Sequence, residues 1–332
     1  MPRKLRKLRR RIRPGPRFRL ATGRARILPS FLVLGAQRAG TTTLFDHLLR
    51  HPDVRGPHAG GDEVEWRRKE VHFFDERFWR GLDWYRSFFP LAASRRIARL
   101  RGGDLVAGEA TPYYLFHPLV PERVAKTIPE VGLIALLRDP VERAYSHYQM
   151  MRRTGREKLS FAEALAAEEE RLASAVELAA GEEEGAFGDD RRRRHHHHRH
   201  RAYFARGLYA EQLERWLAHF PREQLLVLLA EDLFARPSAV CEDVVAFLGL
   251  RPHDLTARSS RATTASPGRP WSKRQTRNRA AYEAISPEVR ARLEQRYAEP
   301  NARLARLLGP EFAWGRASAG EQLAPGVETP GA

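Results

Sequence analysis

A short loop rich in glycine and threonine has the residue types and spacing of a phosphate-binding site. It runs Gly35-Ala-Gln-Arg-Ala-Gly-Thr-Thr-Thr43 and lies between an apolar run at Phe31–Leu34 and a helical pattern at Thr41–Arg50. Glycine allows the backbone to approach an anion closely, and a helix N-terminus presents unpaired N–H groups at the positive end of its dipole. The strand–loop–helix context therefore predicts a bound phosphate group. The alternative is a turn that contains glycine and binds no ligand.

The basic residue of this loop does not lie where a nucleoside triphosphatase would place it. In the pattern G-x-x-x-x-G-K-[ST], a lysine follows the second glycine and reaches the β- and γ-phosphates. Here Gly35 and Gly40 have that spacing, but Thr41 occupies the lysine position and Arg38 lies inside the loop. The missing lysine argues against hydrolysis of ATP or GTP.

A second basic site is predicted at the end of another apolar run. Val131–Leu137 has the composition of a buried strand, and a helical pattern follows from about Pro140 to Arg153. Arg138 comes directly after the strand, so its side chain would point into the crevice where open α/β sheets bind ligands. The alternative for Arg138 and Asp139 is an ordinary surface ion pair.

A third segment, Lys69-Glu-Val-His-Phe-Phe-Asp75, offers candidates for a general base. A hydroxyl is a poor nucleophile until a positioned base accepts its proton. Glu70 is the first candidate, and His72 is its rival because the pKa of an unperturbed histidine is near neutral. The alternative is a strand-edge segment whose charged residues face solvent.

With the base segment lying between the two basic motifs in the chain, the three segments resemble the sulfotransferases that use 3'-phosphoadenosine-5'-phosphosulfate (PAPS), in particular the heparan sulfate and carbohydrate branch. The loop is similar to the family's 5'-phosphosulfate loop, P-K-x-G-T-[ST], with Arg38 in place of the lysine. The resemblance implies that Arg38 contacts the bridging oxygen as charge develops on the leaving phosphate. The residues that it implies for binding the 5'-phosphate are Ala39, Gly40, Thr41, Thr42 and Thr43.

The same resemblance assigns roles to the other two segments. It implies that Arg138 and Ser146 bind the 3'-phosphate of PAPS, and a late loop offers Arg269 for the same phosphate. In this branch a glutamate is the catalytic base, which favours Glu70 over His72. Further residues that would lie near the acceptor are Lys69, His72, Asp75 and Trp84.

One element of the resemblance weakens the case for a heparan-like acceptor. Gly108-Glu-Ala-Thr-Pro-Tyr113 is similar to a family element, G-E-x-[ST]-P-x-Y, that lies near the acceptor. The heparan O-sulfating members usually carry lysine where this chain has Ala110.

These motifs require an α/β fold to position them. Apolar runs at Phe31–Leu34, Val131–Leu137 and Leu225–Leu229 alternate with helical patterns, the last of them at Ser238–Leu248. Strands that alternate with helices predict a single domain, similar to P-loop folds, with a central parallel sheet flanked by helices. PAPS would lie at the carboxyl ends of the strands.

The chain of 332 residues divides into three expected parts. Residues 1–30 form an arginine-rich arm, 31–312 a sulfotransferase domain and 313–332 a disordered tail. A low-complexity insertion is expected at about 157–201. It ends in a histidine tract that could bind metal, but a continuous run lacks separated ligands on fixed elements. We therefore expect no metal.

Composition limits the compartment and the partners. The net charge of +17 is carried mostly by arginine, which suits phosphate and sulfate oxygens but does not identify a ligand. A single cysteine, Cys241, rules out an internal disulfide and fits a cytoplasmic location. We expect no nucleic-acid partner, and at most a weak contact of the basic arm with an anionic membrane. The oligomeric state is not indicated.

The sequence therefore predicts a sulfotransferase that moves a sulfuryl group from PAPS to a hydroxyl or amine, on a carbohydrate or glycolipid acceptor. Two alternatives remain at this point. One is a P-loop kinase or NTPase, which would need a magnesium site. The other is a non-catalytic protein that binds anions.

Overall fold

A computed structural model describes residues 15–58, 69–172, 198–256, 284–312 and 314. Several sequence predictions fall elsewhere in the chain. Arg269, residues 1–14 of the basic arm, His195–His197 and the tail from 315 onward lie outside the described residues.

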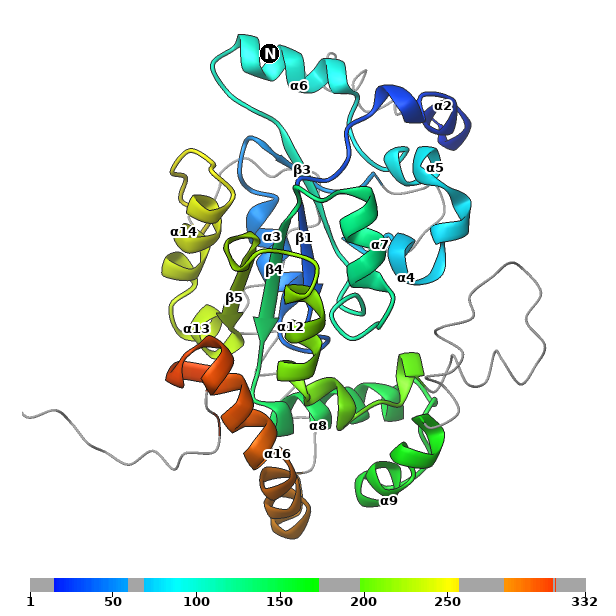
Figure 1. The fold of residues 1–332 in the computed structure, drawn as a ribbon, viewed down its shortest axis with the longest axis vertical. Coiled ribbons are helices and arrows are strands. Elements are labelled where there is room, and N and C mark those ends of the chain that lie inside the picture. Colours follow the sequence, from blue (N-terminus) through cyan, green and yellow to red (C-terminus); the bar gives the residue numbers. More distant parts are fainter. Residues whose placement is uncertain (1–14, 59–68, 173–197, 257–283, 313, 315–332) are drawn as a thin grey trace, which may run out of the picture.

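The core is a parallel five-stranded sheet in the order β2-β3-β1-β4-β5 (Figure 1). The strands are β1 Phe31–Gly35, β2 Val54–Arg55, β3 Val106–Ala110, β4 Gly132–Leu137 and β5 Leu225–Leu229. The predicted α/β class with a central parallel sheet is confirmed. Because helices cover a parallel sheet on both faces, its strands are near-continuous apolar runs, and this explains why three of them could be found in the sequence.

The two central strands carry the motifs. β1 is buried at every position, and it pairs with β4 in the register Leu32 to Leu133. β3 pairs with the other side of β1, where Gly108 lies opposite Phe31. A Cβ atom at Gly108 would overlap the ring of Phe31, so glycine is required there. This glycine and the following Glu109 interrupt the apolar pattern of β3.

Helices lie on both faces of the sheet (Figure 1). α3 Thr41–Leu48 packs against α14 Pro237–Phe247, while α7 Val120–Thr127 and α12 Tyr209–Leu217 lie on the opposite side. Further α-helices with defined bounds among the described residues are α2 Pro16–Ala21, α4 Phe73–Glu76, α5 Leu82–Arg86, α6 Ala92–Leu100, α8 Pro140–Arg153, α9 Phe161–Ala166, α13 Ala230–Ala235 and α16 Pro287–Leu308. Single 3-10 turns are η1 Gly23–Ala25, η3 Phe78–Arg80, η4 Ala205–Gly207, η5 Arg222–Gln224 and η6 Pro310–Phe312. Within the described residues, no helix combines the length and apolarity needed to cross a bilayer.

Helix α8 begins directly beyond the end of β4. Asp139 is its N-cap, and the carboxylate accepts a hydrogen bond from the N–H of Glu142 at 2.8 Å. Pro140 is the first helical residue, where its missing N–H leaves no hydrogen bond unmade. This sharp start fixes Arg138 at the carboxyl edge of the sheet and places Ser146 in the second turn of α8.

Residues at both ends of the expected insertion, about 157–201, pack against the rest of the domain. Glu157 is buried and accepts a hydrogen bond from the Tyr203 hydroxyl at 3.0 Å. The buried carboxylate of Glu168 accepts the backbone N–H groups of Tyr203, Phe204 and Ala205, at 2.7 to 2.8 Å. Residues 157–172 therefore support the chain that returns at 198–206.

The described end of the basic arm also packs against the domain. Arg26 is buried and donates a hydrogen bond to the carbonyl of Phe89 at 2.7 Å. Its backbone forms an isolated antiparallel bridge with Leu91. The described part of the arm therefore packs against α5 and residues 89–91.

Candidate active site

The phosphate loop has an unusual backbone at two positions. Arg38 has φ 77° and Gly40 has φ 103°, both in the left-handed region, and α3 begins at Thr41. Glycine adopts such a φ at little cost, whereas for arginine it is uncommon. Among the described residues, His72 is the one other non-glycine residue with a positive φ. Strained backbone of this kind clusters at functional sites, and here both residues belong to the motifs singled out in the sequence.

The two basic motifs meet at the carboxyl edge of the sheet. The Nη1 of Arg138 donates to the carbonyl oxygen of Arg38 at 3.2 Å. The Nε of Arg38 in turn donates to the hydroxyl of Ser146 at 3.1 Å. Tyr209 supports this junction from α12, because its hydroxyl donates to the carbonyl of Arg138 at 2.8 Å. Three residues predicted to bind the donor therefore form one connected group.

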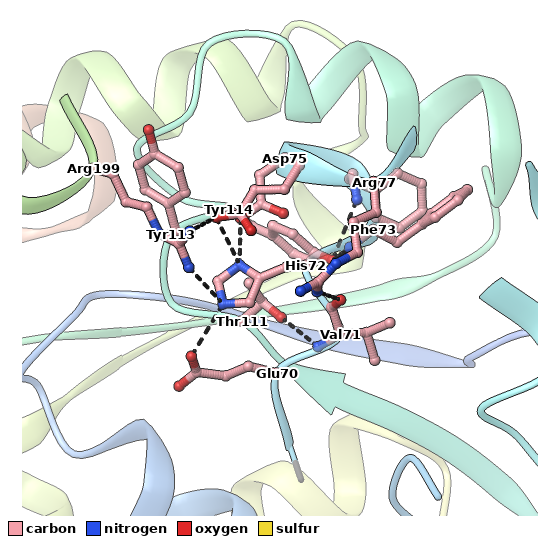
Figure 2. Close-up of polar contacts among 12 residues, drawn as sticks. Glu70, Val71, His72, Phe73, Asp75, Arg77, Thr111, Tyr113, Tyr114 and Arg199 are labelled. Carbon is pink, nitrogen blue, oxygen red and sulfur yellow. Dashed lines mark hydrogen bonds and ion pairs between the residues drawn. The ribbon is translucent and has the colours of Figure 1, made fainter. Parts of the chain in front are cut away.

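The predicted base segment forms a chain of charged side chains, shown in Figure 2. His72 is central: its Nδ1 lies 2.6 Å from Asp75 Oδ2, and its Nε2 lies 3.3 Å from Glu70 Oε2. The other oxygen of Glu70 pairs with Lys69 Nζ at 3.0 Å. Asp75 is fully buried and Lys69 almost so. The short helix α4, which starts after His72, holds Asp75 beneath the imidazole.

The charged side chains around them give the two candidate bases, Glu70 and His72, opposite charges. Burial alone would raise the pKa of Glu70, but Lys69 and His72 outweigh it and lower that pKa to about 2. Burial alone would lower the pKa of His72, but Asp75, Glu70 and Glu76 raise it to about 10. At neutral pH Glu70 is a carboxylate that can accept a proton, while His72 is an imidazolium that cannot. These charge states favour Glu70 over His72 as the candidate base, and its catalytic role stays a prediction.

Glu109, a buried acid to which the sequence interpretation assigned no role, connects the base segment to the sheet. Glu109 of β3 is fully buried, and burial raises the pKa of its carboxyl group. It accepts hydrogen bonds from the hydroxyls of Tyr85 at 2.6 Å and Tyr114 at 3.0 Å, and from the N–H of Val71 at 3.0 Å. Thr111 adds a fourth at 2.7 Å. An acid inside a strand bordered by apolar residues was the signal that could have revealed it.

Trp84 lies in an aromatic layer behind the base segment. It is partly buried on α5, with its ring centroid 6.2 Å from that of Phe73 and 4.8 Å from that of Phe88. The guanidinium of Arg80 lies 5.2 Å from the same ring. Its predicted contact with the acceptor stays a prediction. Trp216, by contrast, is fully buried and is a core residue.

Two arginines to which the sequence interpretation assigned no role also belong to the site. Arg199 forms an ion pair with Glu76, and its Nη2 lies 3.4 Å from His72 Nε2 (Figure 2). Arg206 is buried, and burial lowers the pKa of its guanidinium to about 9. Arg199 was hidden in the histidine and arginine tract, where composition gives no sign of a fixed position.

The base cluster also has the outline of a cation site. Ligand atoms of His72, Asp75 and Glu76 lie within 4.8 Å of one another. His72 is already bonded to Asp75, however, and the Arg199 guanidinium pairs with Glu76. The cluster therefore forms an ion network within the protein, and the absence of a metal stays a prediction.

Comparison with known proteins identifies the family. A model described as "Sulfotransferase domain" matches residues 28–275. The chain belongs to the sulfotransferase family. The family resemblance proposed from the motifs is thereby confirmed, and the family match favours a transferase over an NTPase.

Relatives of this sulfotransferase include two named for heparan sulfate. The human bifunctional heparan sulfate N-deacetylase/N-sulfotransferase 3 is 32% identical over 230 residues, covering 68% of this chain. The match spans only 23% of that relative's length. The mouse heparan sulfate glucosamine 3-O-sulfotransferase 3A1 is 27% identical over 315 residues, covering 91% of this chain and 68% of the relative.

A solved structure agrees with the fold. The sulfotransferase from Alicyclobacillus acidocaldarius is 29% identical, with a TM-score of 0.55. The match covers 85% of this chain and 96% of that chain. The described architecture is therefore that of a known sulfotransferase along most of its length.

Proposed function

We propose that this sulfotransferase transfers a sulfuryl group from PAPS to a hydroxyl or amine of a carbohydrate or glycolipid. The observation that carries the proposal is the junction of the two donor motifs. Arg138 bonds to the carbonyl of Arg38, and Arg38 bonds to Ser146, although the first two residues lie 100 positions apart. A donor with phosphates at both its 5' and 3' positions would contact both motifs at once. A turn without a ligand, or a surface ion pair, would not require the two motifs to meet.

The residues suit an in-line displacement. The sulfur–oxygen bond to the donor phosphate breaks as a bond forms between sulfur and the acceptor atom, and the acceptor's proton passes to the carboxylate of Glu70. Arg38 would stabilise the negative charge that develops on the leaving phosphate oxygen. Arg138 and Ser146 would hold the 3'-phosphate, and Ala39–Thr43 the 5'-phosphate.

The low pKa of Glu70 is compatible with this role. Because Lys69 and His72 hold its pKa at about 2, its carboxylate is ionised at neutral pH and can accept a proton. A carboxylate with such a low pKa is a weak base in the resting site, however. Proton transfer would therefore accompany bond formation to sulfur, when the acceptor proton becomes acidic.

A carbohydrate acceptor is supported by the relatives named for heparan sulfate, whose names include both N- and 3-O-sulfotransferases. The base segment alone does not choose between nitrogen and oxygen. Ala110, which stands where the heparan O-sulfating members usually carry lysine, has its carbonyl bonded to Lys69 Nζ at 3.2 Å. Lys69 therefore supplies a cation near that strand position from a different segment.

The test is transfer of label from [³⁵S]PAPS to a panel of acceptors: heparosan, its N-deacetylated form, chondroitin and a glycolipid such as galactosylceramide. We expect label in at least one acceptor, and no transfer by the Glu70→Gln variant. Nucleotide preference is measured in parallel by calorimetry. Tighter binding of ATP with magnesium than of 3'-phosphoadenosine-5'-phosphate (PAP) would contradict the proposal and support an NTPase.

A further inference from the structure

Arg199 reaches the base cluster from a part of the chain that has no place in the motifs. It lies at the end of the histidine and arginine tract, in the described segment 198–201. Its guanidinium forms an ion pair with Glu76 of α4 and lies 3.4 Å from Nε2 of His72. Figure 2 shows the Arg199 guanidinium and the Glu70 carboxylate directed at the same imidazole nitrogen.

Arg199 and Glu70 compete for the same imidazole nitrogen. His72 Nε2 lies 3.3 Å from the Glu70 carboxylate and 3.4 Å from the Arg199 guanidinium. A protonated Nε2 can donate to Glu70 but offers no lone pair to Arg199, whereas an unprotonated Nε2 can accept from Arg199 but not bond to Glu70. Because Nδ1 is already 2.6 Å from Asp75, the proton on Nε2 decides which of the two partners is bonded.

We infer that Arg199 is a positioning residue that opposes the bond between His72 and Glu70 and so releases Glu70 Oε2 to receive the acceptor's proton. The role of Glu70 as base rests on the proposed function, while the competition for Nε2 rests on the contacts alone. With Arg199 removed, the imidazolium holds Glu70 more firmly. With Arg199 in place, the imidazolium still predominates at neutral pH, but the like charge raises the small share of neutral imidazole, in which Lys69 is the remaining partner of Glu70.

The segment that carries Arg199 is tied to the phosphate loop. Arg206 donates from Nη1 to the side-chain oxygen of Gln37 at 2.5 Å, and from Nη2 to the carbonyl of Arg199 at 2.6 Å. The same Nη2 lies 3.1 Å from the carbonyl of His198. Arg206 lies over the ring of Tyr113, whose hydroxyl bonds to His198. Donor loop and base cluster are therefore connected through one buried guanidinium, and a change in the loop would be felt at Arg199.

The charges around His72 act in opposite directions. Glu70 from its own segment and Asp75 and Glu76 from α4 favour the imidazolium. Arg199 faces it with a like charge, which favours the neutral form. His117 and Tyr113 lie farther off, and they act on Asp75 and on its neighbours. Loss of Arg199 would remove the opposing cation and at the same time leave His72 as the remaining ion-pair partner of Glu76, so both effects stabilise the imidazolium.

The experiment follows His72 by ¹⁵N side-chain NMR of the full chain with PAP bound, from pH 6 to 10.5. In the wild type we expect Nε2 to begin losing its proton at the upper end of this range. In Arg199→Ala and Arg199→Gln, the pH at which Nε2 loses its proton should rise by about one unit or more. This rise corresponds to a decrease of about tenfold or more in the acid dissociation constant of His72. Arg199→Lys, which keeps the charge, should stay close to the wild type. An unchanged or lowered titration in both neutral variants would overturn the inference.

A matched control separates this effect from general loosening of the segment. Arg201 bonds to the carbonyl of Arg156, away from His72. Arg201→Ala should leave the titration of His72 unchanged, and the same shift in Arg201→Ala as in Arg199→Ala would contradict a specific role of Arg199.

The transfer rate gives a second readout that a merely structural role would not produce. With [³⁵S]PAPS and N-deacetylated heparosan, Arg199→Ala should be about tenfold slower at pH 7.5 and recover toward the wild-type rate at higher pH. A loss that is equal at every pH would contradict the inference. If the wild type itself transfers no label to any acceptor, the proposed function fails, but the NMR result still decides whether Arg199 controls His72.

Discussion

The donor side and the base side of this sulfotransferase are built in different ways. The donor side is formed by the loop Gly35–Gly40, the first turns of two helices and a few arginine contacts, and it lies at the ends of two adjacent central strands. The base side is a network of ion pairs and hydrogen bonds whose members come from residues 69–76, from β3 and from 198–206. The first uses the backbone, so its pattern is local; the second uses side chains that distant segments bring together.

This difference has an energetic consequence. Backbone N–H groups at a helix start bind an anion without any partner inside the protein. Buried ionised side chains, in contrast, destabilise the folded state unless each is paired. Removal of one partner therefore leaves an unpaired charge in the protein interior. We therefore expect substitutions on the donor side to affect binding locally, whereas those on the base side should also affect folding.

Glu109→Ala should have the largest effect, because it would destabilise the base side as a whole. It removes the acceptor for Tyr85, Tyr114, Thr111 and the N–H of Val71, all of which are buried. Unpaired buried groups cost about 1–3 kcal/mol each, so we expect the free energy of unfolding to fall by about 3–5 kcal/mol. Urea denaturation measures it. A loss below about 1 kcal/mol would show that Glu109 does not support the segment.

Arg138→Ala should weaken the binding of PAP and change the free energy of unfolding only slightly. A hydrogen bond to a charged group contributes about 1.5–3 kcal/mol, so the affinity should fall by about 10- to 100-fold. Calorimetric titration with PAP measures the loss. Arg152→Ala, near the end of α8, is the control, since Arg152 is exposed and bonds to the carbonyl of Lys158. Equal affinity in Arg138→Ala and the wild type would remove Arg138 from the 3'-phosphate site.

His72 should make the stability of the base side depend on pH. Its folded pKa of about 10 lies above the unfolded value near 6.5, so its contribution is complete below pH 6.5 and is lost as the pH rises through about 10. The difference in unfolding free energy between wild type and His72→Gln should be roughly 2 kcal/mol at pH 6 and should shrink steadily toward pH 10. A difference that stays constant, or that grows over this range, would mean that His72 is not an imidazolium in the folded protein.

Arg38→Lys should have the smallest effect. It introduces the lysine that the family usually carries and keeps the charge, but lysine cannot reproduce both the Nε bond to Ser146 and the planar fork of arginine. We expect the transfer rate to change by less than about tenfold and PAP affinity to change little. Arg38→Met, which removes the charge, should lower the rate much more. Equal rates in Lys and Met variants would show that no cation is needed there.

The same contrast explains what could be predicted from the sequence. The loop, the start of α3, and β4 with Arg138 were all found because each is a continuous local pattern. β3 was not found, since Gly108, which packs against Phe31, and the buried Glu109 interrupt its apolar run. Fold class and family were predicted and are confirmed.

The base side was predicted only in its contiguous part. Glu70, His72 and Asp75 lie in one segment, and the structure brings them into one chain of hydrogen bonds. Arg199 could not be predicted, because no periodicity or composition marks which residue of a basic tract will meet an acid from another element. Their catalytic and binding roles remain predictions.

The central claim is that donor binding and proton acceptance are separate tasks of the two sides, and Glu70→Gln tests it most directly. PAP affinity and transfer of label from [³⁵S]PAPS are measured on the same preparation. We predict PAP affinity within about threefold of the wild type and a transfer rate lower by 10² to 10⁴, the range that a general base contributes. Transfer at the wild-type rate, or a loss of PAP binding as large as the loss of rate, would contradict the account.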